Sequence, residues 1–182
     1  GQPMGIMPAG VVPAAGPAIA VAAAGGQAAA TFIFENSTAM YSRVAAECSA
    51  KAEWYWRARM WDQVFQFNLA VGTGGSSAYW SPGAIPGSPA GTLLGKPVNI
   101  VEHVSALGTV GDVFLADFSQ YKIVDHATAA IRFDASNAPR FLTDETLLRI
   151  VMRIGGAPSW TTFLTPDRDT TTESCFLTVA TR

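Results

Sequence analysis

The chain has 182 residues, a net charge of −2 and 14% charged residues, against about 25% in an average soluble domain. This length allows one ordinary hydrophobic core with at most a small appendage. Arg and Lys are scattered from Arg43 to Arg182, which argues against a concentrated basic surface and against sequence-specific nucleic-acid binding. So few charges could hardly cover an isolated globule, and we expect neighbouring molecules to cover part of the apolar surface.

The N-terminal part is rich in Gly, Ala and Pro and offers one strand candidate, residues 18–22. No charge precedes Glu35, but prolines interrupt this stretch and its apolar content is mostly Ala, so we predict neither a targeting segment nor a membrane span. Residues 31–48 predict a helix, because apolar side chains recur at helical spacing on one face. Residues 52–57 predict a strand, because two tryptophans alternate with polar or charged neighbours.

The rest of the chain predicts a second, short helix around residues 60–65 and then mostly strands. The strand candidates are residues 79–80, 92–101, 113–118, 121–124, 129–133, 146–154, 160–164 and 176–181. Residues 146–154 also fit one helical face, but their β-branched side chains favour a strand. Residues 155–158, Gly-Gly-Ala-Pro, predict a turn. Helices and strands without a repeating βαβ pattern predict an α+β fold.

One segment suggests an enzyme. Gly74-Gly75-Ser76-Ser77-Ala78 approaches the Gly-x-Ser-x-Gly turn of serine hydrolases, with Ala in the final position. Asp117 and His126 follow in the order that such enzymes use, so the alternative hypothesis is acyl transfer by Ser76, with His126 as base and Asp117 orienting it. The following segment contains proline and cannot continue as the helix that this turn requires. We therefore predict that the protein is not an enzyme.

Other ligand sites are not indicated. Gly91–Lys96 has three residues between its glycines, whereas a phosphate-binding loop needs four. The two histidines lack a paired pattern of metal ligands, and the acidic residues near the C-terminus lack the spacing of a calcium loop (Asp167, Asp169 and Glu173). The sequence thus predicts no catalytic residue, no metal and no cofactor.

Cysteine and tryptophan have different expected roles. Two cysteines, Cys48 and Cys175, do not make a disulfide framework in a chain of this size, and we predict that both are reduced, mostly buried thiols. Three of the five tryptophans lie on predicted core faces (Trp54, Trp56 and Trp61). Trp80 lies beside the Pro- and Gly-rich segment 81–91 and is the best candidate for a contact with a partner.

Two segments carry a family resemblance. Gly91-Thr92-Leu93-Leu94-Gly95-Lys96-Pro97-Val98 and Ala116-Asp117-Phe118-Ser119-Gln120-Tyr121 resemble, in this order and at this spacing, two strands of the axial domain of tailed-phage major capsid proteins of the Hong Kong 97-like family. Weaker similarities to the same family lie at residues 1–7, 34–43, 69–75, 87–93, 158–165 and 176–182.

The resemblance implies an α+β fold in which a mixed sheet flanked by helices forms an axial domain, followed by returning C-terminal β-strands of a peripheral domain. It divides the chain into a Gly-, Ala- and Pro-rich entry segment (1–30), the axial domain (31–140) and the returning strands (141–182). The arm, projecting loop and long spine helix of the family would precede the Gly-rich turn at residues 1–7.

The function that the resemblance implies is structural. Such a subunit self-assembles into pentamers and hexamers of an icosahedral capsid that encloses a bacteriophage genome. Its partners would be other copies of itself and portal, scaffold or decoration proteins, in a virion assembled in the host cytoplasm without a membrane. The segment 81–91 would approach a symmetry axis, so the candidate subunit contacts are Trp80, Ala84, Ile85 and Pro86.

Overall fold

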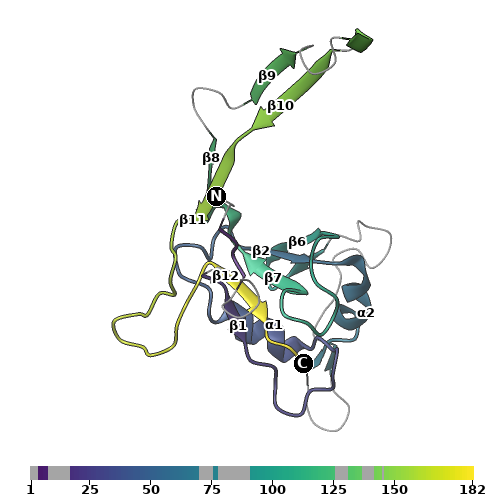
Figure 1. Ribbon diagram of the computed structural model, residues 1–182. Helices are drawn as coiled ribbons and strands as arrows, with labels where there is room; N and C mark the ends of the chain where they lie inside the picture. Colours follow the sequence, from purple (N-terminus) through teal and green to yellow (C-terminus); the bar gives the residue numbers. More distant parts are fainter. Residues whose placement is uncertain are drawn as a thin grey trace.

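The computed structural model describes residues 4–7, 17–69, 76–77, 91–125, 131–136, 142–144 and 146–182. Its main body is a six-stranded sheet, from which a long two-stranded ribbon projects (Figure 1). In spatial order the strands of the sheet are β1 (Ile19–Val21), β12 (Phe176–Val179), β7 (Val113–Ala116), β2 (Glu53–Trp56), β6 (Lys96–Ile100) and β5 (Thr92–Leu93). The pairs β1–β12 and β2–β6 are parallel and the others antiparallel. The predicted α+β class with a mixed sheet is confirmed.

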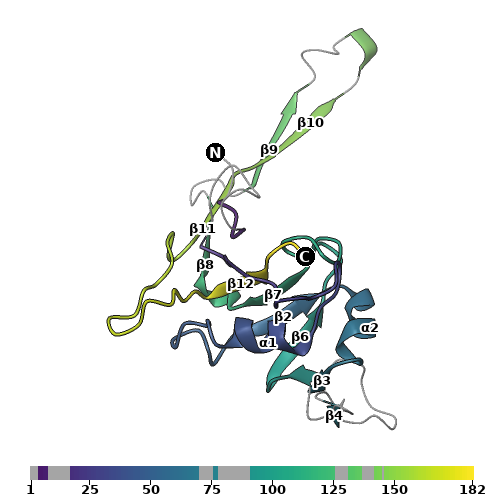
Figure 2. The same cartoon turned by 90° about the horizontal axis from the view of Figure 1, so that it is seen from below.

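Helices in the described part are short. Helix α1 (Phe34–Tyr41) packs against β1 and β12. The 3-10 turn η1 (Ala58–Met60) and helix α2 (Trp61–Val64) lie toward the β6 side of the sheet (Figures 1 and 2). A second 3-10 turn, η2 (Phe118–Gln120), joins the sheet to the ribbon.

The core forms around alternate side chains of β2. Trp54 and Trp56 are fully buried, as their spacing of two residues predicts for one face of a strand. The Trp54 Nε1–H group donates to the carbonyl oxygen of Leu93 at 2.9 Å, so its one polar group is paired. Trp61 packs edge-on against Trp56, with ring centroids 5.7 Å apart. The expectation that these three tryptophans serve the core is confirmed.

The strand expected over residues 92–101 is divided into β5 and β6 by a two-residue turn. Leu94 and Gly95 have positive φ angles of 50° and 73°, as the tightest turns between antiparallel strands require. Lys96 begins β6, and its Nζ atom donates to the carbonyl oxygen of Ser49. The segment that superficially resembles a phosphate loop is thus a structural hairpin.

The helix expected over residues 31–48 is only partly correct, because α1 ends at Tyr41. The following loop instead pairs with a distant segment through a backbone bridge between Val44 and Ser174. The Ala45 N–H group donates to the Ser174 carbonyl oxygen at 3.1 Å. This hydrogen bond uses a donor that a longer helix would direct to its own preceding turn.

The prediction of two reduced thiols is wrong. Cys48 and Cys175 form a disulfide, with Cα atoms 5.5 Å apart. The two residues are 127 positions apart in the chain, so local sequence could not reveal that the loop after α1 meets the start of β12.

The ribbon consists of two successive antiparallel ladders. Next to the sheet, β8 (Tyr121–Asp125) pairs with β11 (Ile154–Pro158). Farther out, β9 (Ile131–Ser136) pairs with β10 (Leu147–Met152) (Figure 1). Arg153 alone separates β10 from β11, whereas residues 126–130 separate β8 from β9. The domain boundary predicted at residue 140, between the axial domain and the returning strands, stays a prediction. Two observations do not follow it: β9 and β10 lie on opposite sides of residue 140 and pair with each other, and β12 lies in the main sheet.

The prediction of a turn over residues 155–158 is wrong, because these residues belong to β11. A Cβ atom on Gly156 would lie 2.7 Å from the Tyr121 Oη atom, so the glycine makes room for this ring. The Tyr121 hydroxyl donates to the Met4 carbonyl oxygen at 2.8 Å, and the Met4 N–H donates to the Gly156 carbonyl oxygen at 2.7 Å. The N-terminal segment is thereby fastened to the base of the ribbon.

No regular strand forms over residues 160–164, although the sequence predicts one. Leu164 makes an isolated antiparallel bridge with Glu173 within the excursion between β11 and β12. The two remaining short strands, β3 (Asn68–Leu69) and β4 (Ser76–Ser77), pair with each other.

Candidate assembly surface

One face of the outer ribbon is entirely apolar. Because residues opposite each other in an antiparallel ladder point to the same side, the register of β9 with β10 assigns six residues to one face. These are Ile131, Phe133, Ala135, Leu148, Ile150 and Met152. The five large side chains among them are between 53% and 65% exposed. We call this set the apolar ribbon face.

The opposite face of the same ladder is more polar. Arg149 lies opposite Asp134, and Leu147 lies opposite Ser136. A ribbon with one apolar and one polar face resembles the half-buried strands of antiparallel sheets, which pack one side against a core. The described part of this chain supplies no such core beneath the outer ribbon, which stands clear of the main sheet in two perpendicular views (Figures 1 and 2).

Apolar exposure is concentrated on the ribbon. Of the fifteen large hydrophobic side chains that are exposed among the described residues, ten lie between Tyr121 and Pro158. An isolated two-stranded hairpin has marginal stability in water. Fully burying a side chain of this size contributes about 1.5–3 kcal/mol, so covering five that are more than half exposed contributes on the order of 5 kcal/mol. The ribbon is therefore the strongest candidate for a surface that another element or molecule covers.

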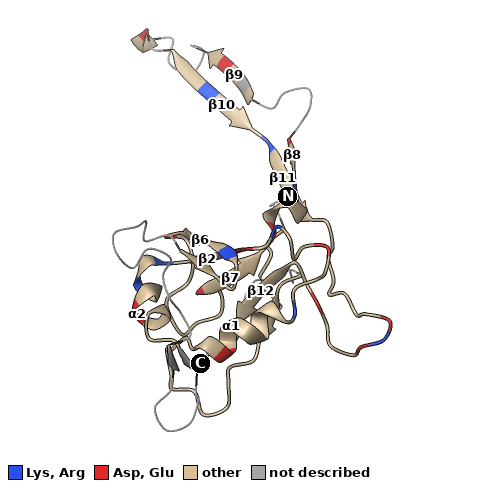
Figure 3. Cartoon of the chain, turned by 180° about the vertical axis from the view of Figure 1, so that it is seen from behind, with Lys and Arg blue, Asp and Glu red and all other residues tan. Residues whose placement is uncertain are grey.

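Charged residues are sparse in the described part of the chain, and residues of opposite sign are interspersed. Figure 3 shows Lys and Arg interspersed with Asp and Glu over long uncharged stretches, without a concentrated basic area among the coloured residues. This agrees with the scattered cations of the sequence and gives no support to a nucleic-acid interface.

The residues of the alternative hydrolase hypothesis are not brought together where they are described. Ser76 lies in β4 and Asp117 follows β7, and Figure 2 shows β4 far from the start of the ribbon, which Asp117 precedes. Asp117 is buried, and its Oδ1 atom accepts the Ser119 N–H at 2.9 Å, so it caps η2. His126 lies outside the described residues. Nothing in this arrangement supports acyl transfer.

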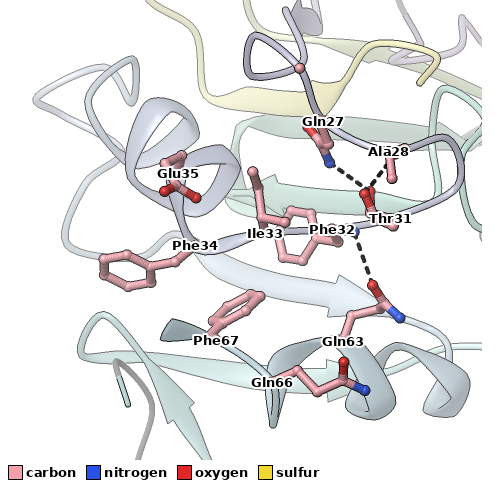
Figure 4. A pocket seen from close by; sticks show the side chains of 11 residues that line it. Gln27, Ala28, Thr31, Phe32, Ile33, Phe34, Glu35, Gln63, Gln66 and Phe67 are labelled. Atoms are coloured by element: carbon pink, nitrogen blue, oxygen red, sulfur yellow. Dashed lines mark hydrogen bonds between the residues drawn. The ribbon is translucent and has the colours of Figure 1, made fainter. Parts of the chain in front are cut away.

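A surface pocket of about 470 Å³ lies beside the N-terminal end of α1 (Figure 4). Its aromatic wall consists of Phe32, Phe34 and Phe67, and the Phe67 ring centroid lies 5.6 Å from that of Phe32 and 5.9 Å from that of Phe34. Two of its glutamine side chains already bond to the backbone: the Gln27 amide donates to the Thr31 carbonyl oxygen at 2.8 Å, and Gln63 Oε1 accepts the Phe32 N–H at 3.4 Å. The residues lining it include no Ser, Cys, His or Lys, and the hydroxyl of Thr31 donates to the Ala28 carbonyl oxygen at 2.7 Å rather than to a base.

Metal and membrane sites also find no support in the described part of the chain. It contains no group of three or more potential metal ligands. Hydrogen bonds from Thr171 lower the pKa of Asp169 below its ordinary value, and the same bonds close an exposed turn. No described helix has the length and apolar content that crossing a bilayer requires.

The candidate contacts Trp80, Ala84, Ile85 and Pro86 lie outside the described residues, so their role stays a prediction. The apolar ribbon face was missed as a candidate site. Its signal was present, because the apolar residues of 146–154 alternate with Arg149 and Arg153, but this pattern is also that of a half-buried strand in an ordinary domain.

Comparisons with known proteins agree with this architecture. The model of a family described as the phage capsid family matches residues 1–161. The fold is similar to the capsid of an empty GTA particle computed with C5 symmetry, with a TM-score of 0.55 and 19% identity over 91% of this chain and 56% of that chain. It is also similar to the capsid of a native GTA particle computed with C5 symmetry, with a TM-score of 0.53 and 20% identity over 91% of this chain and 48% of that chain. The chain thus spans about half the length of these capsid chains. A search of curated proteins finds no match.

Proposed function

Because the chain belongs to the phage capsid family, we propose that it is a shell-forming portion of a capsid subunit and has a structural rather than an enzymatic role. The observation that carries this proposal is the apolar ribbon face, because the described residues leave this large hydrophobic surface uncovered and another part of the shell, within the same subunit or a neighbouring one, must cover it. The six-stranded sheet would form the axial domain. Because β12 is a strand of this sheet, the axial domain would also include β12, beyond the boundary expected at residue 140. The ribbon would belong to the peripheral domain.

The main partner in this proposal is a second copy of the chain. Copies would associate into pentamers and hexamers of an icosahedral shell that encloses the genome. The C5 symmetry with which both similar capsids were computed supports this arrangement. Portal, scaffold and decoration proteins would be further partners, and the particle would assemble in the host cytoplasm to become the virion.

The apolar ribbon face would be covered within the complete subunit by the long spine helix that the family resemblance places before the Gly-rich turn at residues 1–7. This chain covers 56% and 48% of the similar capsid chains, which leaves room in them for such a helix. Met4 supports this position, because its backbone hydrogen bond to Gly156 holds the N-terminal segment against the base of the ribbon.

The segment 81–91 would line the symmetry axis, with Trp80, Ala84, Ile85 and Pro86 as subunit contacts. Its support is the absence of charge in a segment that five or six copies would bring together. Replacing Ala84 and Ile85 by Asp in the full-length protein should prevent capsomer formation. Normal capsomers in negative-stain electron micrographs would remove this role from the segment.

The ribbon itself can be tested with one matched pair of substitutions in the full-length protein. Ile150→Lys places a charge on the apolar ribbon face, whereas Leu147→Lys places the same charge on the polar face of the same strand. We expect Ile150→Lys to abolish closed shells and Leu147→Lys to leave them largely intact, as measured by sedimentation and electron microscopy. Buried tryptophan fluorescence would verify that the main sheet is folded in both variants. Equal shell yields from the two variants would contradict the proposal.

A further inference from the structure

The disulfide between Cys48 and Cys175 closes most of the chain into one covalent loop. The two residues are separated by 127 positions, and the loop between them contains the ribbon, the excursion and four strands of the main sheet. Constraining so long a segment removes much conformational freedom from the unfolded chain. The disulfide should therefore raise the free energy of unfolding of the subunit substantially.

The backbone holds the two cysteines together without help from their side chains. Val44 and Ser174 form a parallel bridge, with one hydrogen bond from Ala45 N–H to the Ser174 carbonyl oxygen and another from Ser174 N–H to the Arg43 carbonyl oxygen, at 3.1 and 3.2 Å. The Arg43 Nε–H group also donates to the Thr172 carbonyl oxygen at 3.0 Å. Two thiols at these positions would already be within bonding reach, so neither oxidation nor reduction requires a different fold.

Both cysteines are sealed from solvent, with exposed fractions of 0% and 2%. Their surroundings are apolar and include Ala45, Phe114 and Phe176. An external thiol or disulfide cannot reach a sulfur atom in this position unless the loop after α1 moves away from Ser174. Exchange at this site is therefore gated by local opening of that loop.

We propose that Cys48 and Cys175 form a redox-governed staple, which is open as two thiols under reducing conditions and closes in the folded subunit on oxidation. A low-molecular-weight disulfide is the oxidant. The thiolate of one cysteine attacks it, forming a mixed disulfide and releasing one small thiol; the thiolate of the other cysteine then attacks the mixed disulfide and releases the second. The protein loses two protons and two electrons, and the small disulfide is reduced to two thiols.

The proposal concerns the subunit alone and stands whether or not shells form. Thiol titration of the unfolded chain should find two thiols after purification with reductant and none after incubation of the native protein with oxidised glutathione. The reduced and oxidised proteins should have the same circular dichroism spectrum. Their unfolding equilibrium constants in urea should differ by about a thousandfold or more, as expected for a closed loop of this length.

The double variant Cys48→Ala, Cys175→Ala provides the control, because its unfolding should not respond to oxidised glutathione. Arg43→Ala loosens the junction without touching either sulfur, and it should accelerate reduction of the native disulfide by dithiothreitol at least tenfold. Two remaining thiols after oxidation, disulfide-linked dimers on a non-reducing gel, or equal stability of the reduced and oxidised forms would overturn the staple. An unchanged reduction rate in Arg43→Ala would overturn its gating by the loop.

Discussion

Replacing Arg182 by methionine tests how the C-terminal residue is held against the sheet. Its guanidinium group forms a two-pronged ion pair with Asp112, with Nη2–Oδ2 and Nη1–Oδ1 distances of 2.6 and 3.3 Å, and both side chains are 1% exposed. The Nε–H group donates to the carbonyl oxygen of Thr31, and the guanidinium lies over the Phe32 ring. The Gly108 N–H group also donates to Asp112, at 2.9 Å.

The expected loss in the free energy of unfolding follows from the charged group that each substitution leaves buried. Arg182→Met keeps the aliphatic bulk but leaves the Asp112 carboxylate buried with the Gly108 N–H as its one remaining hydrogen-bond donor among the described residues. Breaking a buried ion pair from one side costs about 3–5 kcal/mol, most of it the desolvation of the charge that remains. Asp112→Asn removes the negative charge that pairs with the buried guanidinium, which keeps its hydrogen bond to the Thr31 carbonyl oxygen and its contact with the Phe32 ring. In the double variant neither charge remains, so we expect its loss to be smaller than the sum of the two single losses by about 2–3 kcal/mol.

Urea unfolding followed by the fluorescence of the buried tryptophans would measure all four proteins. With a slope of about 1–3 kcal/mol per molar urea, each single variant should lose at least about 1 M in its midpoint. Arg59→Met makes the same chemical change at an exposed site and should alter the free energy of unfolding by less than about 0.5 kcal/mol. Single losses below about 1 kcal/mol, or additive losses in the double variant, would refute the view that this pair anchors the C-terminus.

Two further predictions concern the sheet and the base of the ribbon. Burial, together with the hydrogen bond to Glu53, raises the pKa of Tyr55 to about 12 from its ordinary value of 10.0. The free energy of unfolding should therefore keep its full value below pH 10 and fall as the pH rises toward 12, because Tyr55 ionises first in the unfolded chain. Tyr55→Phe should weaken this fall in urea titrations at pH 8 to 12. Gly156→Val should lower the free energy of unfolding by about 1–3 kcal/mol, because its Cβ would meet the Tyr121 ring. Gly155→Val should lower it far less, because its Cβ has its nearest neighbour at 3.7 Å. Similar losses in the two variants would contradict this account.

The elements that sequence predicts well are those in which burial follows a local period. In β2, Trp54 and Trp56 alternate with Glu53 and Tyr55, and the structure buries the two tryptophans completely. Strands β1 and β12 were also predicted close to their observed bounds. In these segments the burial of each side chain follows the local alternation of apolar and polar residues, so a pattern over a few residues is sufficient to predict the strand.

The elements that sequence predicts poorly depend on distant partners. The loop after α1 has an adequate helical pattern, yet its backbone pairs with Ser174 and its Cys48 bonds to Cys175. The segment 155–158 has the composition of a turn, but Tyr121 fills the space above Gly156 and β8 supplies the hydrogen bonds of a strand. A period of two or of 3.6 contains no information about such contacts.

The candidate assembly surface shows why composition predicted an interface but not its place. A low share of charged residues says that apolar area must be covered, yet Trp54, Leu115 and their neighbours show that the main sheet covers its own. The uncovered area lies instead on a ribbon whose strands pair with each other's backbone, while the described residues place no further layer beneath them. A pair of strands in this state gains little from its own packing. Its apolar face becomes stabilising when a further element covers it, so folding of the outer ribbon and formation of that contact should occur together.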